Sequence, residues 1–164
     1  MGSGLAAFTL FHVALSLIGI LSGLVVVFGL ITAKRLNGCT LLFLVTTLAT
    51  SVTGFLFPFH KLTPGHIVGI ISVVFLALAF YARYSRQLAG AWRRVYVISA
   101  VISLYLNVFV LIVQLFEKVP ALKTLAPTQS EAPFKVAQLG ALVLFIVLGI
   151  LGARRFRADK VSAS

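Results

Sequence analysis

The sequence predicts an all-α fold, a bundle of five helices that each cross a membrane. Of its 164 residues, 60% are hydrophobic and only 10% are charged, and the mean hydropathy is +1.11. Soluble domains carry about 25% charged residues, so this chain has too few to cover a surface that faces water. Its apolar stretches are of helical length, and about 20 such residues suffice to cross a ~30 Å hydrocarbon core.

The apolar stretches divide the chain into five predicted spans within a single transmembrane domain, residues 1–164. The spans cover residues 7–32, 40–58, 64–84, 95–116 and 134–152. In the first span, Gly19 and Gly23 have the GxxxG spacing that lets two helices approach closely. In the second, the threonines share one helical face, where their hydroxyls can bond the helix's own carbonyls. We expect Pro58 to end this helix and Pro64 to begin the next.

A polar stripe marks the fourth span. Its members are Ser99, Ser103, Asn107 and Gln114. Their spacing is close to the helical period, and polar side chains in hydrocarbon need partners, so the stripe should face other helices. It continues to Glu117 and into a proline-rich loop, residues 117–133, which we expect to fold back over the bundle as a lid.

Basic residues are distributed unevenly between the two sides of the predicted bundle. With the amino terminus outside, the cytoplasmic side holds ten: Lys34, Arg35, Arg83, Arg86, Arg93, Arg94, Arg154, Arg155, Arg157 and Lys160. The outer side holds four: Lys61, Lys118, Lys123 and Lys135. The positive-inside rule then predicts an external amino terminus and a cytoplasmic carboxy terminus. The same rule explains the net charge of +11 without nucleic acid as a partner.

Ligand-competent side chains gather on the predicted outer side. A metal ion could be held by His12, His60, His66 and Glu117. A haem or another ligand could contact His12, His66, Asn107 and Gln114. For Asn107 the alternative is a structural hydrogen bond between helices. His12 is the deepest of the histidines, and ionisable residues inside a span are candidates for function.

Catalytic motifs are scarce in this chain. The sequence contains no GxSxG, no Walker loop, no HExxH and no CxxC. Its single cysteine, Cys39, excludes an intramolecular disulfide, and we expect it in a short cytoplasmic connection. These observations favour a protein that is not an enzyme.

Three segments carry a resemblance to known proteins. They are YLNVFVLIVQLFEKVPALKTLAPTQSEAPFKVAQ at residues 105–138, TGFLFPFH at 53–60 and RYSRQLAGAWR at 83–93. With these segments the chain resembles small multi-pass inner-membrane proteins of bacteria to which no activity is assigned. The resemblance implies a bacterial inner-membrane location, and it brings no cofactor and no catalytic residues.

The function that these patterns favour is that of a non-enzymatic integral membrane binding or accessory protein. It would contact the lipid bilayer and act as a homo-oligomer or as a subunit of a larger membrane complex, with a polar pocket on its outer side. Two alternatives stay open. One is a membrane protein that binds a metal ion or haem through the outer histidines and Glu117; the other is a small transporter or channel that uses the stripe from Ser99 to Gln114.

Overall fold

The structure is a computed structural model that describes residues 2–58 and 61–156, and this part of the chain is helical with no strands. Its elements are α1 (Ser3–Ile31), α2 (Asn37–Phe55), α3 (Pro64–Phe80), the π-helical turn η1 (Tyr81–Ser85), α4 (Trp92–Lys118), α5 (Pro120–Leu125) and α6 (Ala132–Arg155). Five helices, with η1 continuing α3, are long and apolar enough to cross a membrane. The all-α transmembrane bundle of five spans is therefore confirmed.

The helix boundaries differ from the predicted ones where proline was read as a breaker. The predicted loop 117–133 contains α5, because Pro120 occupies the first turn of that helix. Pro133 likewise lies in the first turn of α6. At a first helical turn the amide that proline lacks would have no partner within the helix, so proline starts helices as readily as it ends them.

The second span also begins earlier than the sequence predicts. Asn37 is the first residue of α2, so Cys39 lies within the first helical turn and not in a connection. The side chain of Asn37 accepts a hydrogen bond from the guanidinium of Arg83 in η1. This contact ties the start of α2 to the end of α3 and accounts for the burial of Arg83.

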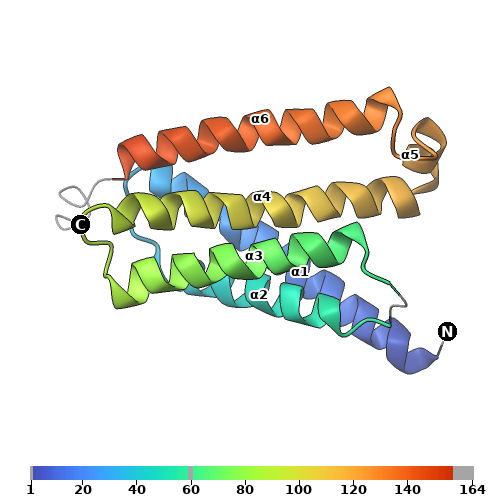
Figure 1. The fold of residues 1–164 in the computed structure, drawn as a ribbon, viewed down its shortest axis with the longest axis horizontal. Coiled ribbons are helices and arrows are strands. Elements are labelled where there is room, and N and C mark those ends of the chain that lie inside the picture. Colours follow the sequence, from blue (N-terminus) through green and yellow to red (C-terminus); the bar gives the residue numbers. More distant parts are fainter. Residues whose placement is uncertain (1, 59–60, 157–164) are drawn as a thin grey trace.

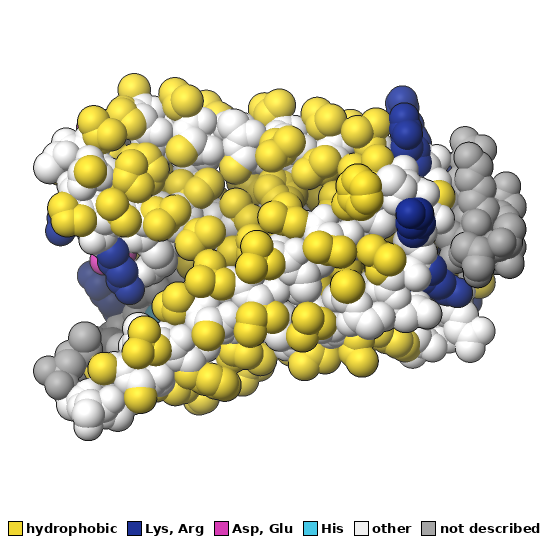
Figure 2. Space-filling view, turned by 180° about the vertical axis from the view of Figure 1, so that it is seen from behind, with side chains coloured by type: hydrophobic (Ala, Val, Ile, Leu, Met, Phe, Trp, Pro, Cys, Tyr) yellow, Lys and Arg dark blue, Asp and Glu magenta, His cyan; other side chains and the backbone are white. Residues whose placement is uncertain are grey.

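The bundle is built around α1 and α4. Helix α1 packs against α2, α4 and α6, and α4 packs against α1, α3 and α6. Figure 1 shows α6 lying along α4 at the edge of the bundle, with the start of α1 and the end of α6 at opposite ends of the molecule. Hydrophobic side chains cover the middle of the surface in Figure 2, and Lys and Arg lie at its two ends. This distribution matches a protein whose middle zone contacts lipid tails.

The two glycines of the GxxxG pair, Gly19 and Gly23, lie where α1, α2 and α4 meet. A Cβ atom added at Gly23 would stand 2.7 Å from Cδ1 of Leu104 on α4 and 2.9 Å from Cδ2 of Phe43 on α2. At Gly19 it would stand 2.9 Å from Oγ1 of Thr47. The GxxxG pair therefore packs against other helices, as predicted, because only glycine leaves room for these neighbours.

The polar stripe of α4 faces the interior for most of its length. Ser99, Ser103 and Asn107 are 2%, 0% and 8% exposed. The hydroxyl of Ser103 donates to the carbonyl oxygen of Ser99 at 2.8 Å. The prediction that the stripe contacts other helices is thus confirmed for these three residues.

Replacing Gly23 with leucine should destabilise the bundle by about 1–3 kcal/mol or more, because the new side chain overpacks against Leu104 and Phe43. The matched control is Gly140→Leu on α6, where an added Cβ has no neighbour within 4 Å. Thermal unfolding in detergent should show a lower midpoint for Gly23→Leu alone. Equal midpoints for the two variants would contradict this packing.

Candidate functional site

The centre of the membrane zone holds a polar contact between α1 and α4. The hydroxyl of Ser16 donates to Oδ1 of Asn107 at 2.9 Å, and Nδ2 of Asn107 donates to the carbonyl oxygen of Ser16 at 3.4 Å. Gly19 lies one turn further along α1, and a Cβ added there would be 3.3 Å from the Asn107 amide. Asn107 therefore has the interhelical role that the sequence offered as one of two readings.

His12 joins α1 to α2. Its Nδ1 lies 2.8 Å from Oγ1 of Thr53, and the Thr53 hydroxyl itself donates to the carbonyl oxygen of Ala49 at 2.7 Å. Either group can be the donor, depending on the imidazole tautomer, and in both cases the hydrogen bond joins the two helices. The ring also meets Phe57 edge-on, with 5.1 Å between centroids. The half-buried histidine thus faces α2 and serves as a contact between helices.

His66 lies in the first turn of α3 and caps that helix. The backbone amide of Thr63 donates to Nδ1 of His66 at 3.2 Å, and the Thr63 hydroxyl lies 2.6 Å from the same nitrogen. Glu or Gln usually occupies this position of a capping box, and here a histidine does so. The ring centroid of His66 is 6.1 Å from that of Phe55 at the end of α2.

Gln114 and Glu117 lie near the carboxyl end of α4, Gln114 half-buried and Glu117 exposed. The loop beside them folds back on α4: the side-chain amide of Gln129 donates to the carbonyl oxygen of Val113 at 2.9 Å, and Ala126 is fully buried. The principal contacts of α5 are with α4. The loop therefore covers the end of α4 only. We had expected a lid that covers the whole bundle.

The loop also stabilises the start of α6 through Glu131. The Glu131 carboxylate accepts a hydrogen bond from the Thr128 hydroxyl at 2.7 Å and from the backbone amides of Thr128 and Ser130 at 3.1 to 3.3 Å. These hydrogen bonds favour the charged carboxylate and hold the pKa of Glu131 below its ordinary value, and the bond from the Thr128 hydroxyl has the largest effect. A charged carboxylate at a helix amino terminus also complements the helix dipole.

The structure places the predicted ligand residues in separate local settings, with His12 against α2, His66 at the cap of α3, and Asn107 against α1. Within residues 2–58 and 61–156, no group of three or more His, Cys, Asp or Glu side chains could hold a metal ion. His60 lies outside the described residues. The metal set of His12, His60, His66 and Glu117, the haem alternative and the transporter alternative all stay predictions.

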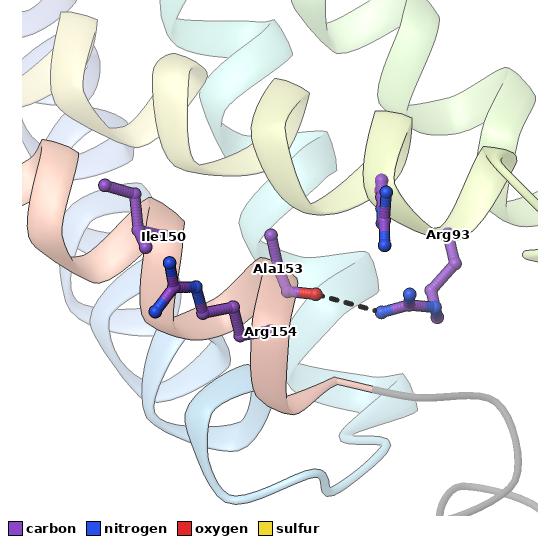
Figure 3. Close-up of a pocket in the computed structure, with 5 residues that line it drawn as sticks. Arg93, Ile150, Ala153 and Arg154 are labelled. Atoms are coloured by element: carbon purple, nitrogen blue, oxygen red, sulfur yellow. Dashed lines mark hydrogen bonds between the residues drawn. The ribbon is translucent and has the colours of Figure 1, made fainter.

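A cluster that the sequence did not single out lies at the other end of the bundle. Arg93 and Arg94, from the start of α4, share a hollow with Arg154, from the end of α6 (Figure 3). The guanidinium of Arg93 donates to the carbonyl oxygen of Ala153 at 3.2 Å and also to that of Phe156. Two consecutive spans start and end on the same membrane side, and this topology was the signal that could have predicted the cluster.

The fold and its contacts are those of a multi-pass membrane protein built as a helical bundle. Comparison with known proteins adds nothing to this description: no family model, no curated protein and no solved structure matches this chain.

The contact between Ser16 and Asn107 is measurable by a double-mutant cycle of Ser16→Ala and Asn107→Ala. We expect a coupling energy of about 0.6–1.7 kcal/mol in the free energy of unfolding, the range found for hydrogen bonds between membrane helices. The control cycle pairs Ser16→Ala with Ser103→Ala, since Ser103 bonds its own helix. Additive effects in both cycles would show that Asn107 serves something other than α1.

Proposed function

We propose that this chain is a non-enzymatic integral membrane binding or accessory protein. The observation that carries the proposal is how the polar residues within the spans are used. Ser16 bonds Asn107 and His12 bonds Thr53. On α2, carbonyls of the same helix accept hydrogen bonds from the hydroxyls of Thr46, Thr50, Ser51 and Thr53. The first two contacts join helices and the others are made within α2, which leaves the apolar outer surface as the means by which the protein meets other molecules.

Helix α6 is the least buried of the five spans. Only Phe145 and Gly152 of α6 are buried. Its exposed large hydrophobic residues are Val136, Leu139, Leu142, Val143, Leu144, Ile146, Val147 and Ile150. In a membrane such a face meets either lipid tails or another apolar helix. The proposal assigns the part of this face that does not line the seam with α4, which includes Val143, Leu144 and Val147, to a second copy of the chain or to a partner subunit.

The proposed orientation has the amino terminus outside and the carboxy terminus in the cytoplasm. It is supported by the distribution of basic residues in the sequence: ten belong to the side predicted to be cytoplasmic and four to the side predicted to be outside. Aromatic residues accompany them: Tyr81 and Trp92 meet edge-on at 5.1 Å, and Arg86 lies 5.3 Å from the Trp92 ring. The resemblance noted above favours the inner membrane of a bacterium as the location.

The alternative is a metal ion held by His12, His60, His66 and Glu117, or a haem, and the chemical composition of the purified protein distinguishes it from this proposal. Absorbance spectroscopy and metal analysis of the purified full-length protein would reveal either group. A stoichiometric metal or a haem spectrum would replace the accessory role with a cofactor-dependent one.

The orientation is tested with single cysteines in a Cys39→Ser background, which removes the chain's only native thiol. The exposed positions are Ala121 on α5 and Ala89 before α4. A membrane-impermeant maleimide should label Ala121→Cys in intact cells and Ala89→Cys only after permeabilisation. The reverse pattern would invert the proposed orientation.

The binding surface is tested by a photoreactive benzophenone residue in place of Leu144 on α6. The matched control replaces Val74 on α3, since both side chains are 54% exposed. Irradiation in the native membrane should give a discrete protein adduct from position 144 and none from position 74. If both positions yield lipid adducts alone, α6 faces lipid and the accessory role loses its surface.

A further inference from the structure

The arginine cluster lines a hollow of about 420 Å³ between the start of α4 and the end of α6. It is lined by Arg93, Arg94, Ile150, Ala153 and Arg154, so three arginines from two helices border one hollow (Figure 3). Arg93 is held in position by the carbonyls of Ala153 and Phe156. The hollow is therefore a strongly cationic concavity supported by two packed helices.

A second hollow of about 280 Å³ follows the seam between α4 and α6. Its lining is apolar almost throughout and includes Val101 and Tyr105 of α4 and Phe145 of α6. Ile150 and Ala153 line both hollows, so the apolar groove begins where the arginine hollow ends. Together the two hollows form one site with a cationic end and an apolar end.

The depth of this site in a membrane follows from its neighbours. Trp92 directly precedes the two arginines of α4 and packs with Tyr81, and such aromatic side chains sit at the level of lipid headgroups. The groove runs from there toward the middle of two spans, where only hydrocarbon surrounds the helices.

We infer that this site binds an anionic phospholipid of the leaflet at the carboxy-terminal end of the bundle. The phosphate lies among Arg93, Arg94 and Arg154, whose planar guanidinium groups suit phosphate oxygens. One acyl chain lies in the groove between α4 and α6. The inference goes beyond the proposed function, since it requires neither a protein partner nor a particular orientation.

The test is native mass spectrometry of the full-length protein, titrated in detergent with dioleoylphosphatidylglycerol or with dioleoylphosphatidylcholine, which has the same chains and no net charge. The first bound phosphatidylglycerol should be held more tightly than phosphatidylcholine. The double variant Arg94→Gln/Arg154→Gln should weaken it by about 30-fold. Arg155→Gln is the matched control, because Arg155 is exposed beside Arg154 and does not line the hollow.

A groove variant tests the acyl-chain half of the site. Gly149 lines the groove, and a Cβ added there would make an ordinary 3.5 Å contact with Val101, so Gly149→Leu fills the groove without a clash at Cβ. This variant should bind phosphatidylglycerol about ten-fold more weakly, while its thermal unfolding midpoint stays that of the parent protein.

Four outcomes would overturn the inference. Equal affinity for the two lipids would remove the role of charge, and an equal loss in Arg155→Gln would reduce it to general surface attraction. Unchanged binding in Gly149→Leu would remove the acyl chain from the groove. Displacement of the lipid by millimolar inorganic phosphate would mean that the arginines bind a free anion.

Discussion

The hydrogen bonds between Asn107 and Ser16 are the contact on which the arrangement of the bundle depends. A carboxamide in hydrocarbon must find a partner, so α4 can present Asn107 only to another helix with a polar group at the same depth. Ser16 provides that group, and it lies one turn from Gly19. The polar contact and the absence of side chains at Gly19 and Gly23 together let α1 approach both α2 and α4 closely.

The two ends of the bundle have different chemical character. The end of the bundle where α6 ends carries Lys34 and all the described arginines: Arg35, Arg83, Arg86, Arg93, Arg94, Arg154 and Arg155. The other end carries the remaining described lysines, both glutamates and the described histidines. Arginine binds phosphate through two parallel hydrogen bonds, while lysine acts as a point charge. The asymmetry that predicts orientation thus also concentrates phosphate-binding groups at one membrane boundary, where α4 and α6 shape them into a hollow.

The histidines illustrate how a residue type alone leaves a role open. His12 was a candidate because an ionisable group inside a span has few ordinary reasons to be there. The structure supplies one: Thr53 on α2 bonds Nδ1, and Phe57 packs against the ring. His66 likewise caps α3 through Thr63. Both roles depend on how neighbouring helices are rotated and on local turn geometry, which residue spacing along one helix does not reveal.

The sequence by itself determined the fold class, the number of spans and the contacts of the GxxxG pair, because hydrophobic length and helical periodicity are local properties of the chain. It also determined that the stripe from Ser99 to Asn107 faces inward, since polar groups avoid lipid. Helix ends that were predicted from prolines were wrong, because a proline can either start a helix or stop one. Only the tertiary structure decided that Asn107 meets Ser16 and that Arg93, Arg94 and Arg154 share one hollow, because both depend on which helices are neighbours and how each is turned about its axis.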